Sequence, residues 1–400
     1  MAKIKKIKGR QVFDSRGNPT VEAEVFSDKG HHALAIVPSG ASTGTHEAFE
    51  LRDKDNKEYL GKSVLKAVEN INVQINKALE KTNINEQKKI DQTLINLDGS
   101  EQKKILGANA ILAVSIASCK LASTENKVSL YEHIGQSKNY QLPVPLLNII
   151  NGGVHARNNL DIQEFMIRPD NTKSFAEAIR HSFLVIQNLK KMLNTNNVGD
   201  EGGFAPDLKD NEEAINLIIK AIEKSGLKPG IDISICLDVA ANELDKPKSI
   251  EYYSDLIKKY PIKSIEDPFG EDEWGLWKKL TKSTKIQIVG DDLFATNIKR
   301  LEKGIDEKSC NTILVKLNQI GTVTETLKVI DLAKKNNFKT IISHRSGDSE
   351  DTFIADLAVA TNSSQIKTGS LARSERVSKY NRLIRIEEEL GNLAKMAKIK

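Results

Sequence analysis

The chain of 400 residues is 39% hydrophobic and 28% charged, which is typical of a globular protein with a large interior, and its length fits two domains or one large barrel with an appendage. No apolar run approaches the roughly 18 residues that a membrane helix needs, and the basic N-terminus lacks the apolar stretch of a signal peptide, so we expect a cytoplasmic protein that spans no membrane. Lysine and arginine exceed the acids by 59 to 54 and are spread along the chain, which agrees with a small anionic substrate and gives no reason to expect nucleic acid as a partner.

The first third of the chain predicts a small α+β domain. Residues 21–26 and 31–38 have strand character and flank a turn, so they indicate an antiparallel hairpin, and the stretch from about 45 to 135 looks helical. The Pro-rich segment LPVPLLNIINGG at residues 142–153 indicates extended backbone at a junction between two parts of the chain.

A repeat of about 25 residues runs through the rest of the chain. Six strand-like segments each carry a charged or polar residue near the end, and the intervals between these residues are 28, 25, 25, 28 and 23. The residues are Asp238, Glu266, Asp291, Lys316, His344 and Lys367. Strands and helices that alternate in this way predict an α/β fold of the (β/α)8-barrel type, with the active site at the C-terminal ends of its strands. We expect this barrel at residues 141–400, preceded by a smaller α+β capping domain at 1–140.

The stretches between these segments have helical periodicity, and the clearest one precedes the first of them. Asp210 and Glu213 form a capping pattern at its start, Gly226 ends it, and isoleucines recur at helical spacing at 215, 218, 219 and 222. We therefore expect an amphipathic helix on the outside of the barrel here.

The cysteines give no sign of a special site. Cys119, Cys236 and Cys310 are far apart and odd in number, which supports neither a disulfide framework nor a zinc site. We expect all three to be buried thiols.

Three acids at successive strand ends, Asp238, Glu266 and Asp291, indicate a metal site. Carboxylate oxygens suit Mg²⁺ better than zinc or copper. A single acid would more simply cap the following helix, but three in register followed by a lysine favour a metal. Lys316 ends an apolar strand, where its charge must be paired or its pKa lowered; with Lys367 and metal ions nearby it would lose its proton more easily and could act as a base. For either lysine alone, a structural salt bridge is the alternative.

Eleven segments in order along the chain, covering about residues 10 to 391, resemble the enolase family: FDSRGNPTVE, SGASTG, LDGS, LGANAIL, NIINGG, NNLDIQEFMI, VGDEGGFAP, SIEDP, GDDL, SHRSGDSEDTFIADLAV and QIKTGSLARSERVSKYNRL. The resemblance implies reversible dehydration of 2-phosphoglycerate to phosphoenolpyruvate, the hydro-lyase reaction of glycolysis and gluconeogenesis. Enolase-superfamily sites are known to use a Lys or His base with one or two Mg²⁺ ions.

The resemblance also implies a role for each matching residue. Asp238, Glu266 and Asp291 would hold one of two Mg²⁺ ions, and Ser39, in the mobile loop PSGASTG, would join the shell of the second when that loop closes. Lys316 would remove the α-proton. Glu201 would protonate the departing hydroxyl, with its pKa raised by the like-charged Glu164. The substrate-binding residues would be His155, Gln163, Glu164, Lys316, Arg345, Ser346 and Lys367.

The sequence departs from the family pattern away from these residues. The chain after 238–244 and the link between Met192 and Val198 are short, the tail after Gly391 lacks the usual extension, and Arg157 replaces a small or acidic residue. These departures concern rim loops and subunit contacts, for which we expect a homodimer, with an octamer as the alternative.

Two other functions stay open at this point. One is another superfamily enzyme, such as a cycloisomerase or a sugar-acid dehydratase, which would share the acids and the lysine but not the SGAST, DEGG and HRSG segments. The other is a noncatalytic paralogue kept for binding, as a cell-surface receptor or in an RNA-degrading assembly. The complete set of matching residues favours catalysis and leaves room for such a second role.

Overall fold

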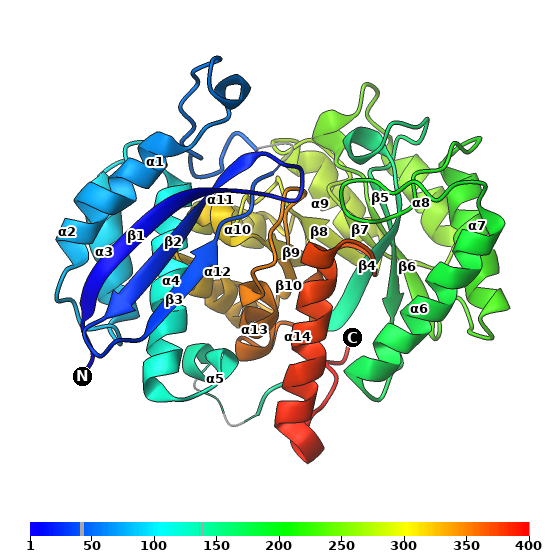
Figure 1. Ribbon diagram of the computed structural model, residues 1–400. Helices are drawn as coiled ribbons and strands as arrows, with labels where there is room; N and C mark the ends of the chain where they lie inside the picture. Colours follow the sequence, from blue (N-terminus) through cyan, green and yellow to red (C-terminus); the bar gives the residue numbers. More distant parts are fainter. Residues whose placement is uncertain (41–43, 136, 138, 400) are drawn as a thin grey trace.

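The computed structural model describes residues 1–40, 44–135, 137 and 139–399, and it shows a three-stranded sheet with its helices beside a closed barrel of eight strands (Figure 1). The sheet is antiparallel and consists of β1 (Ile4–Phe13), β2 (Pro19–Ser27) and β3 (His32–Ile36). β2 and β3 form the predicted hairpin. β1 was not predicted, because two exposed lysines lie between its buried Ile4 and Ile7 and interrupt the alternation of apolar and polar residues that indicates a strand.

The helices of the N-terminal part occupy less of the chain than expected. They are η1 (Tyr59–Gly61), α1 (Leu65–Asn70), η2 (Ile71–Ile75), α2 (Asn76–Leu79), α3 (Gln87–Asp98), α4 (Ala108–Asn126) and α5 (Leu130–Gly135). The prediction of helix was wrong for residues 45–58. There the backbone N–H groups bond to distant segments: that of Ala48 donates to the carbonyl of Gln319 at 2.8 Å, and that of Phe49 to the carbonyl of Gln102 at 2.7 Å.

Helix α4 connects the N-terminal sheet to the barrel. It contacts β2 and β3 of the sheet and also α11 (Leu317–Ile320) and α12 (Val323–Lys335) of the barrel. Most of its residues are buried, as expected for a helix with mainly small and apolar side chains that is covered on two sides. The two parts of the molecule therefore share a packed interface.

The barrel strands follow one another around the barrel in chain order: β4 (Val144–Asn151), β5 (Glu164–Pro169), β6 (Ile233–Asp238), β7 (Ile262–Glu266), β8 (Gln287–Gly290), β9 (Thr312–Val315), β10 (Lys339–Ser343) and β11 (Gln365–Lys367). The predicted α/β barrel is confirmed, but its strands are not all parallel, because β5 pairs antiparallel with both β4 and β6. The Pro-rich segment, which was expected to be a junction, forms β4 itself.

The remaining helices surround the barrel: α6 (Phe175–Met192), α7 (Asn211–Lys224), α8 (Ile250–Lys259), α9 (Trp274–Ser283), α10 (Ile298–Glu307), α11, α12, α13 (Phe353–Ala360) and α14 (Ser374–Leu390), with short turns η3 (Gly153–His155), η4 (Ala241–Glu243) and η5 (Gly391–Leu393). Helix α7 starts where the capping pattern predicts, since the carboxylate of Asp210 accepts a hydrogen bond from the backbone N–H of Glu213 at 2.9 Å. Gly226 follows the helix with φ +74°, a conformation that favours glycine.

The inside of the barrel is filled by side chains from six of its strands: Leu146, Met166, Cys236, Val289, Leu314 and Ile341. The barrel is therefore a packed core rather than a pore. All three cysteines are buried and free, as predicted, and burial raises the pKa of the Cys236 thiol to about 12.

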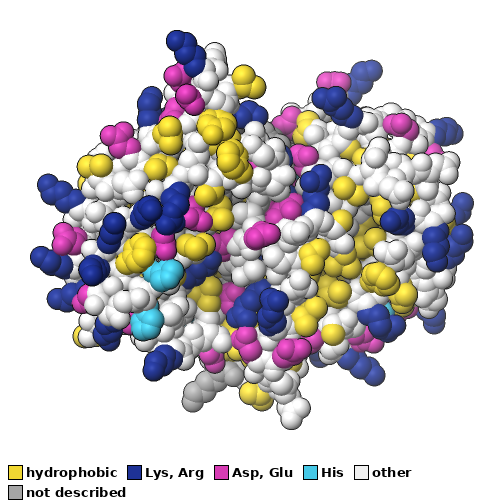
Figure 2. Space-filling view, viewed as in Figure 1, with side chains coloured by type: hydrophobic (Ala, Val, Ile, Leu, Met, Phe, Trp, Pro, Cys, Tyr) yellow, Lys and Arg dark blue, Asp and Glu magenta, His cyan; other side chains and the backbone are white. Residues whose placement is uncertain are grey.

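The surface carries no single block of positive charge on the visible face, because Lys and Arg side chains are scattered over both parts of the molecule (Figure 2). Among the described residues, no helix has both the length and the apolar character needed to cross a membrane.

Candidate active site

The residues that define the repeat meet at one rim of the barrel. Asp238, Glu266 and Lys367 are the last residues of β6, β7 and β11, while Asp291, Lys316 and His344 directly follow β8, β9 and β10. Glu164 reaches the same rim in another way. It is the first residue of β5, which runs in the opposite direction, and it pairs directly with Asp238.

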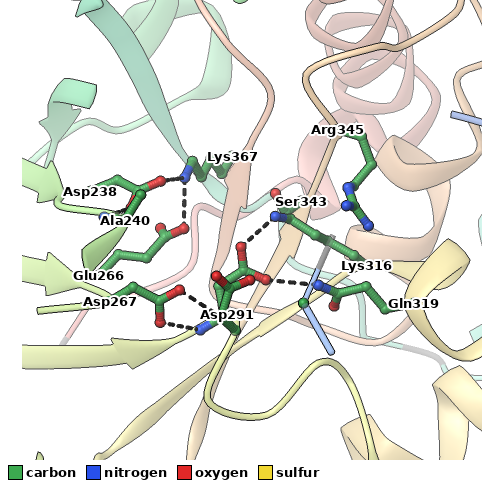
Figure 3. Close-up of polar contacts among 12 residues, drawn as sticks. Asp238, Ala240, Glu266, Asp267, Asp291, Lys316, Gln319, Ser343, Arg345 and Lys367 are labelled. Carbon is green, nitrogen blue, oxygen red and sulfur yellow. Dashed lines mark hydrogen bonds and ion pairs between the residues drawn. The ribbon is translucent and has the colours of Figure 1, made fainter. Parts of the chain in front are cut away.

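The two lysines of the rim hold the three predicted metal acids (Figure 3). Nζ of Lys367 lies 2.8 Å from Oδ2 of Asp238, 2.8 Å from Oε1 of Glu266 and 3.2 Å from Oε1 of Glu164. Lys316 donates a hydrogen bond to Asp291. The acids and lysines predicted from the strand ends thus form one connected group of charges.

Two residues that the sequence did not single out hold Asp291 in place. Asp267, next to Glu266 in SIEDP, accepts hydrogen bonds from the backbone N–H groups of Asp291 and Asp292, each at 2.9 Å. Nε2 of Gln319 donates to Oδ1 of Asp291 at 3.0 Å. The position of Asp267 beside a predicted ligand was the one available signal, whereas nothing in the sequence pointed to Gln319.

The charge state of Lys316 differs from the prediction. Burial acts to lower the pKa of this lysine, but the adjacent Asp291 carboxylate, together with Glu266, acts to raise it, and the net pKa lies above its usual value. Lys367 acts in the predicted, lowering direction, and Arg345, for which no such effect was predicted, acts in the same direction. The expected low pKa is therefore not present while Asp291 is the partner of Lys316.

The acidic groups at this rim could hold a divalent metal. Six carboxyl groups line the cavity, opposed there by Lys316, Lys367 and Arg345: Glu164, Glu201, Asp238, Asp267, Asp291 and Asp292. Six carboxyl groups against three cations leave negative charge in excess at this cavity. Burial, and then the charge of Asp238, raise the pKa of the neighbouring Glu266 well above its usual value. Such a set of oxygen donors fits a hard dication.

The acid group whose oxygens already converge is not the predicted trio. One oxygen each from Asp267, Asp291 and Asp292 lie within 4.8 Å of one another, whereas the ammonium of Lys367 lies between Asp238 and Glu266. The side chains leave a cavity of only about 30 Å³, and Lys316 and Lys367 both line it.

A second group, opposite Lys316, contains His155, Glu164 and Glu201. One oxygen of each glutamate and a ring nitrogen of His155 lie within 4.8 Å of one another. Asn148 of β4, which was not predicted, donates to Oε2 of Glu201 at 3.0 Å. Oε2 of Glu164 and Oε1 of Gln163 are buried and have no hydrogen-bond partner among the described residues, so acceptors on this wall remain available.

The pKa values of Glu164 and Glu201 shift in opposite directions, whereas a raised pKa was predicted for Glu201. Burial and the charge of Glu201 raise the pKa of Glu164 well above its usual value. Burial also acts to raise the pKa of Glu201, but the His344 and His155 rings when charged, and then Lys367, act to lower it well below its usual value. A neutral His344 ring removes the largest of these lowering effects. The raised pKa that was expected on Glu201 is therefore found on its neighbour.

The residues predicted to bind phosphate also lie at the cavity. Arg345 and Ser346 both line it. The guanidinium of Arg345 binds the carboxylate of Glu47 through two hydrogen bonds, at 2.9 and 3.2 Å, and donates to Oδ1 of Asn318 at 3.0 Å. Glu47, which comes from the N-terminal part, was not predicted to contact the site.

Ser39 is the one predicted residue that lies apart from the others. Its hydroxyl donates to Glu50 at 3.0 Å and accepts from Arg52 at 3.2 Å, and its backbone pairs with Gly347. The neighbouring Gly40 lines the cavity. Residues 41–43 of the predicted mobile loop lie outside the described part of the chain.

Comparison with known proteins gives one consistent family. The family model for the N-terminal domain of enolase matches residues 4–134, and that for the enolase C-terminal TIM barrel domain matches residues 139–251 and 244–400. The two segments of the second match meet near the loop that the sequence marked as short. A relative named enolase, from Pelagibacter ubique (strain HTCC1062), is 62% identical over 418 residues, which cover all of both chains.

Proposed function

Because this chain belongs to the enolase family and is therefore a phosphopyruvate hydratase, a hydro-lyase of glycolysis, we propose that Lys316 and Glu201 carry out its two proton transfers from opposite sides of 2-phosphoglycerate. The topology of the barrel carries this proposal. β5 and β9 lie four strands apart in either direction around the closed barrel, so Glu164 and Lys316 face each other across the rim. Glu201 lies beside Glu164. A substrate bound between Lys316 on one side and Glu164 and Glu201 on the other would turn its α-carbon to the lysine and its hydroxyl to the glutamates.

Lys316 is the proposed base. The α-proton of the substrate lies next to a carboxylate, so its removal adds negative charge to an anion, and the amine must be neutral to accept it. Arg345 and Lys367 both act to lower the pKa of Lys316. Once Asp291 is engaged elsewhere, these two cations favour the neutral amine that a general base requires.

Glu201 is the proposed acid for the departing hydroxyl. Asn148 holds its Oε2, which leaves Oε1 for the substrate. Two buried carboxyl groups this close retain a proton between them, because both cannot ionise at low cost. Burial and the charge of Glu201 favour the proton on Glu164. We propose that this proton moves to Glu201 when substrate binds, and that Glu201 donates it to the hydroxyl as the carbon–oxygen bond breaks.

We propose two Mg²⁺ ions as the cofactor, the first held by Asp238, Glu266 and Asp291 and the second involving Ser39. When bound, the metal supplies positive charge beside the substrate carboxylate. Lys367, released from the acids that it now pairs with, would bind the same carboxylate. The excess of buried carboxylates over cations supports this assignment.

Substrate contacts come from both walls and from the phosphate end. Arg345 would hold the phosphate with its planar fork, assisted by the Ser346 hydroxyl, and Glu47 keeps that fork in place until substrate arrives. His155 and Gln163, with the unpaired Oε1 of Gln163, would contact the hydroxyl side.

Several broader statements are part of the same proposal. We place the division between the two domains near residue 140, the protein in the cytoplasm with a secondary cell-surface location, and two chains in the active enzyme. The reaction itself requires no nucleic acid and no membrane.

The reaction can be tested directly on the purified chain. With 2-phosphoglycerate and Mg²⁺, the ultraviolet absorbance of phosphoenolpyruvate should rise. An excess of chelator should abolish this rise and added Mg²⁺ should restore it, because the acids lose the cation that they are proposed to bind. Full activity in excess chelator would contradict the metal assignment, and no product with Mg²⁺ present would contradict the proposed reaction.

A further inference from the structure

A buried arginine on α14 contacts two loops of the site that are far apart in sequence. Arg376 is fully buried, and its guanidinium donates to the carbonyls of Arg345 at 2.6 Å, Ser346 at 2.6 Å and Asp200 at 3.2 Å. The first two carbonyls belong to the proposed phosphate residues, and the third precedes the proposed acid, Glu201. One side chain thus fixes the spacing between the two loops.

The same guanidinium also determines which nitrogen of His344 carries a proton. Nη1 of Arg376 lies 2.5 Å from Nδ1 of His344. A guanidinium has only donors and does not lose its charge in proteins, so Nδ1 must accept, and it therefore has no proton. The ring is then neutral, with its proton on Nε2.

The protonated nitrogen points into the site. Nε2 of His344 lies 3.3 Å from Oε1 of Glu201 and has no hydrogen-bond partner among the described residues, while the residue itself lines the cavity and is only 2% exposed. The N–H is therefore a donor available to the oxygen that leaves the substrate or to Glu201.

We propose that Arg376 is a positioning residue, which holds His344 as the neutral Nε2–H tautomer beside Glu201 and keeps the acid loop in register with the phosphate loop. The expected loss of kcat rests on the proposed function, but the tautomer of His344 does not depend on any substrate. The pKa of His344 agrees with a neutral ring. Burial and, less strongly, the charge of Arg376 lower this pKa well below its usual value, even though Glu201 acts to raise it.

The tautomer can be read by NMR on the full chain with ¹⁵N-labelled histidine rings, assigned with His344→Gln. At neutral pH the wild-type ring should show an unprotonated Nδ1 and a protonated Nε2. A proton on Nδ1 in the wild type would overturn the proposal without any variant. This measurement needs no substrate, so it stands even if the chain fails to dehydrate 2-phosphoglycerate.

Two substitutions test the positioning role. Arg376→Met removes every donor and the charge, so Nδ1 of His344 should gain a proton. Arg376→Lys keeps one positive charge and is the second test variant if the Met variant does not fold. It should also disturb the site, because one ammonium cannot hold three carbonyls and a ring nitrogen together. Either variant should lower kcat about 100-fold, the loss expected for a small misplacement of reacting groups, while exchange of the α-proton with deuterium, which depends on Lys316, should remain within a few-fold of wild type.

Arg382→Lys is the matched control. Arg382 lies on the same helix and pairs with the buried Asp356, but it contacts neither loop, so its kcat and the His344 signals should match the wild type. Arg376 variants with unchanged kcat would contradict the proposal. Equal loss of exchange and dehydration in those variants would instead indicate a general structural role and would also overturn it.

Discussion

Single residues at the rim stabilise one another's charges, so a cation bound there must compete with lysines. Asp238 and Glu266 share Lys367, and Asp291 pairs with Lys316. Buried carboxylates without a cationic partner would be costly. The lysines therefore stabilise the acids as carboxylates, and a bound dication would replace the lysines as their partner.

The first prediction concerns Asp291→Asn. An amide keeps the size of the side chain but loses the charge, so Mg²⁺ affinity measured by calorimetric titration should fall by at least about 10- to 100-fold. The thermal unfolding transition should stay close to that of the wild type, because the amide oxygen can still accept a hydrogen bond from Lys316 and the charge of Glu266 still acts on that lysine. Asp306→Asn, on the exposed face of α10, is the control and should change neither quantity. Unchanged affinity, or a collapsed transition in Asp291→Asn alone, would favour a structural role for the carboxylate.

The residues of the site that were predicted from sequence are those at strand ends or in family segments, because spacing and local motifs are visible in one dimension. Glu47 and Gln319 were missed because each reaches the site through tertiary contacts alone. Asn148 lies in the family segment NIINGG, but no role was assigned to it there. The pKa of Lys316 is raised and that of Glu201 is lowered in the structure, whereas the opposite shifts were expected for the working site, in the case of Lys316 with metal ions nearby. A pKa depends on the distances to several neighbours at once, and sequence gives the neighbours without the distances.

At the level of elements, the barrel was predicted from its repeat, and the reversed β5 was not. Six regular strand ends are visible as a spacing of about 25 residues, but a short apolar run such as EFMIRP contains no information on its direction. The reversal has a functional consequence, since it brings Glu164 to the rim from the start of its strand. β1 was missed for a different reason, because its charged residues occupy positions between the buried ones.

Asp351 connects elements of both parts of the molecule, and its loss is the second prediction. It accepts hydrogen bonds from Lys120 of α4 at 2.6 Å, from the backbone N–H of Ile36 in β3 at 3.2 Å and from that of Phe353 in α13 at 2.9 Å. Burial acts to raise its pKa, but Lys120 and these bonds outweigh burial and hold it below its ordinary value of 3.8. Its stabilising effect is therefore complete above that value and is lost as the pH falls through the folded-state pKa.

Asp351→Asn should accordingly lower the free energy of unfolding by about 2 kcal/mol at pH 7, the usual contribution of a charged hydrogen bond. Urea titrations from pH 7 down to pH 3 should show the difference from the wild type shrinking below about pH 4. Asp331→Asn, exposed on α12, should stay within about 0.5 kcal/mol of the wild type. A difference that is the same at every pH would contradict the role of the charge.

For the whole molecule, the near-complete match to the enolase family predicts a dimer in solution. Light scattering should give twice the 44.4 kDa of one chain over a broad range of protein concentration. The mass of a single chain throughout that range would refute this prediction, and a mass of eight chains would support the octamer.

The most direct test of the proposed mechanism is exchange of the substrate α-proton with solvent deuterium in two variants. Lys316→Ala should stop exchange and lower turnover by at least about 10²- to 10⁴-fold, the range typical of a general base, because no other group on that wall is proposed to accept the proton. Glu201→Gln keeps the base, so exchange should continue while phosphoenolpyruvate formation nearly ceases. Exchange at the wild-type rate in Lys316→Ala, or its complete loss in Glu201→Gln, would contradict the roles proposed for these two residues.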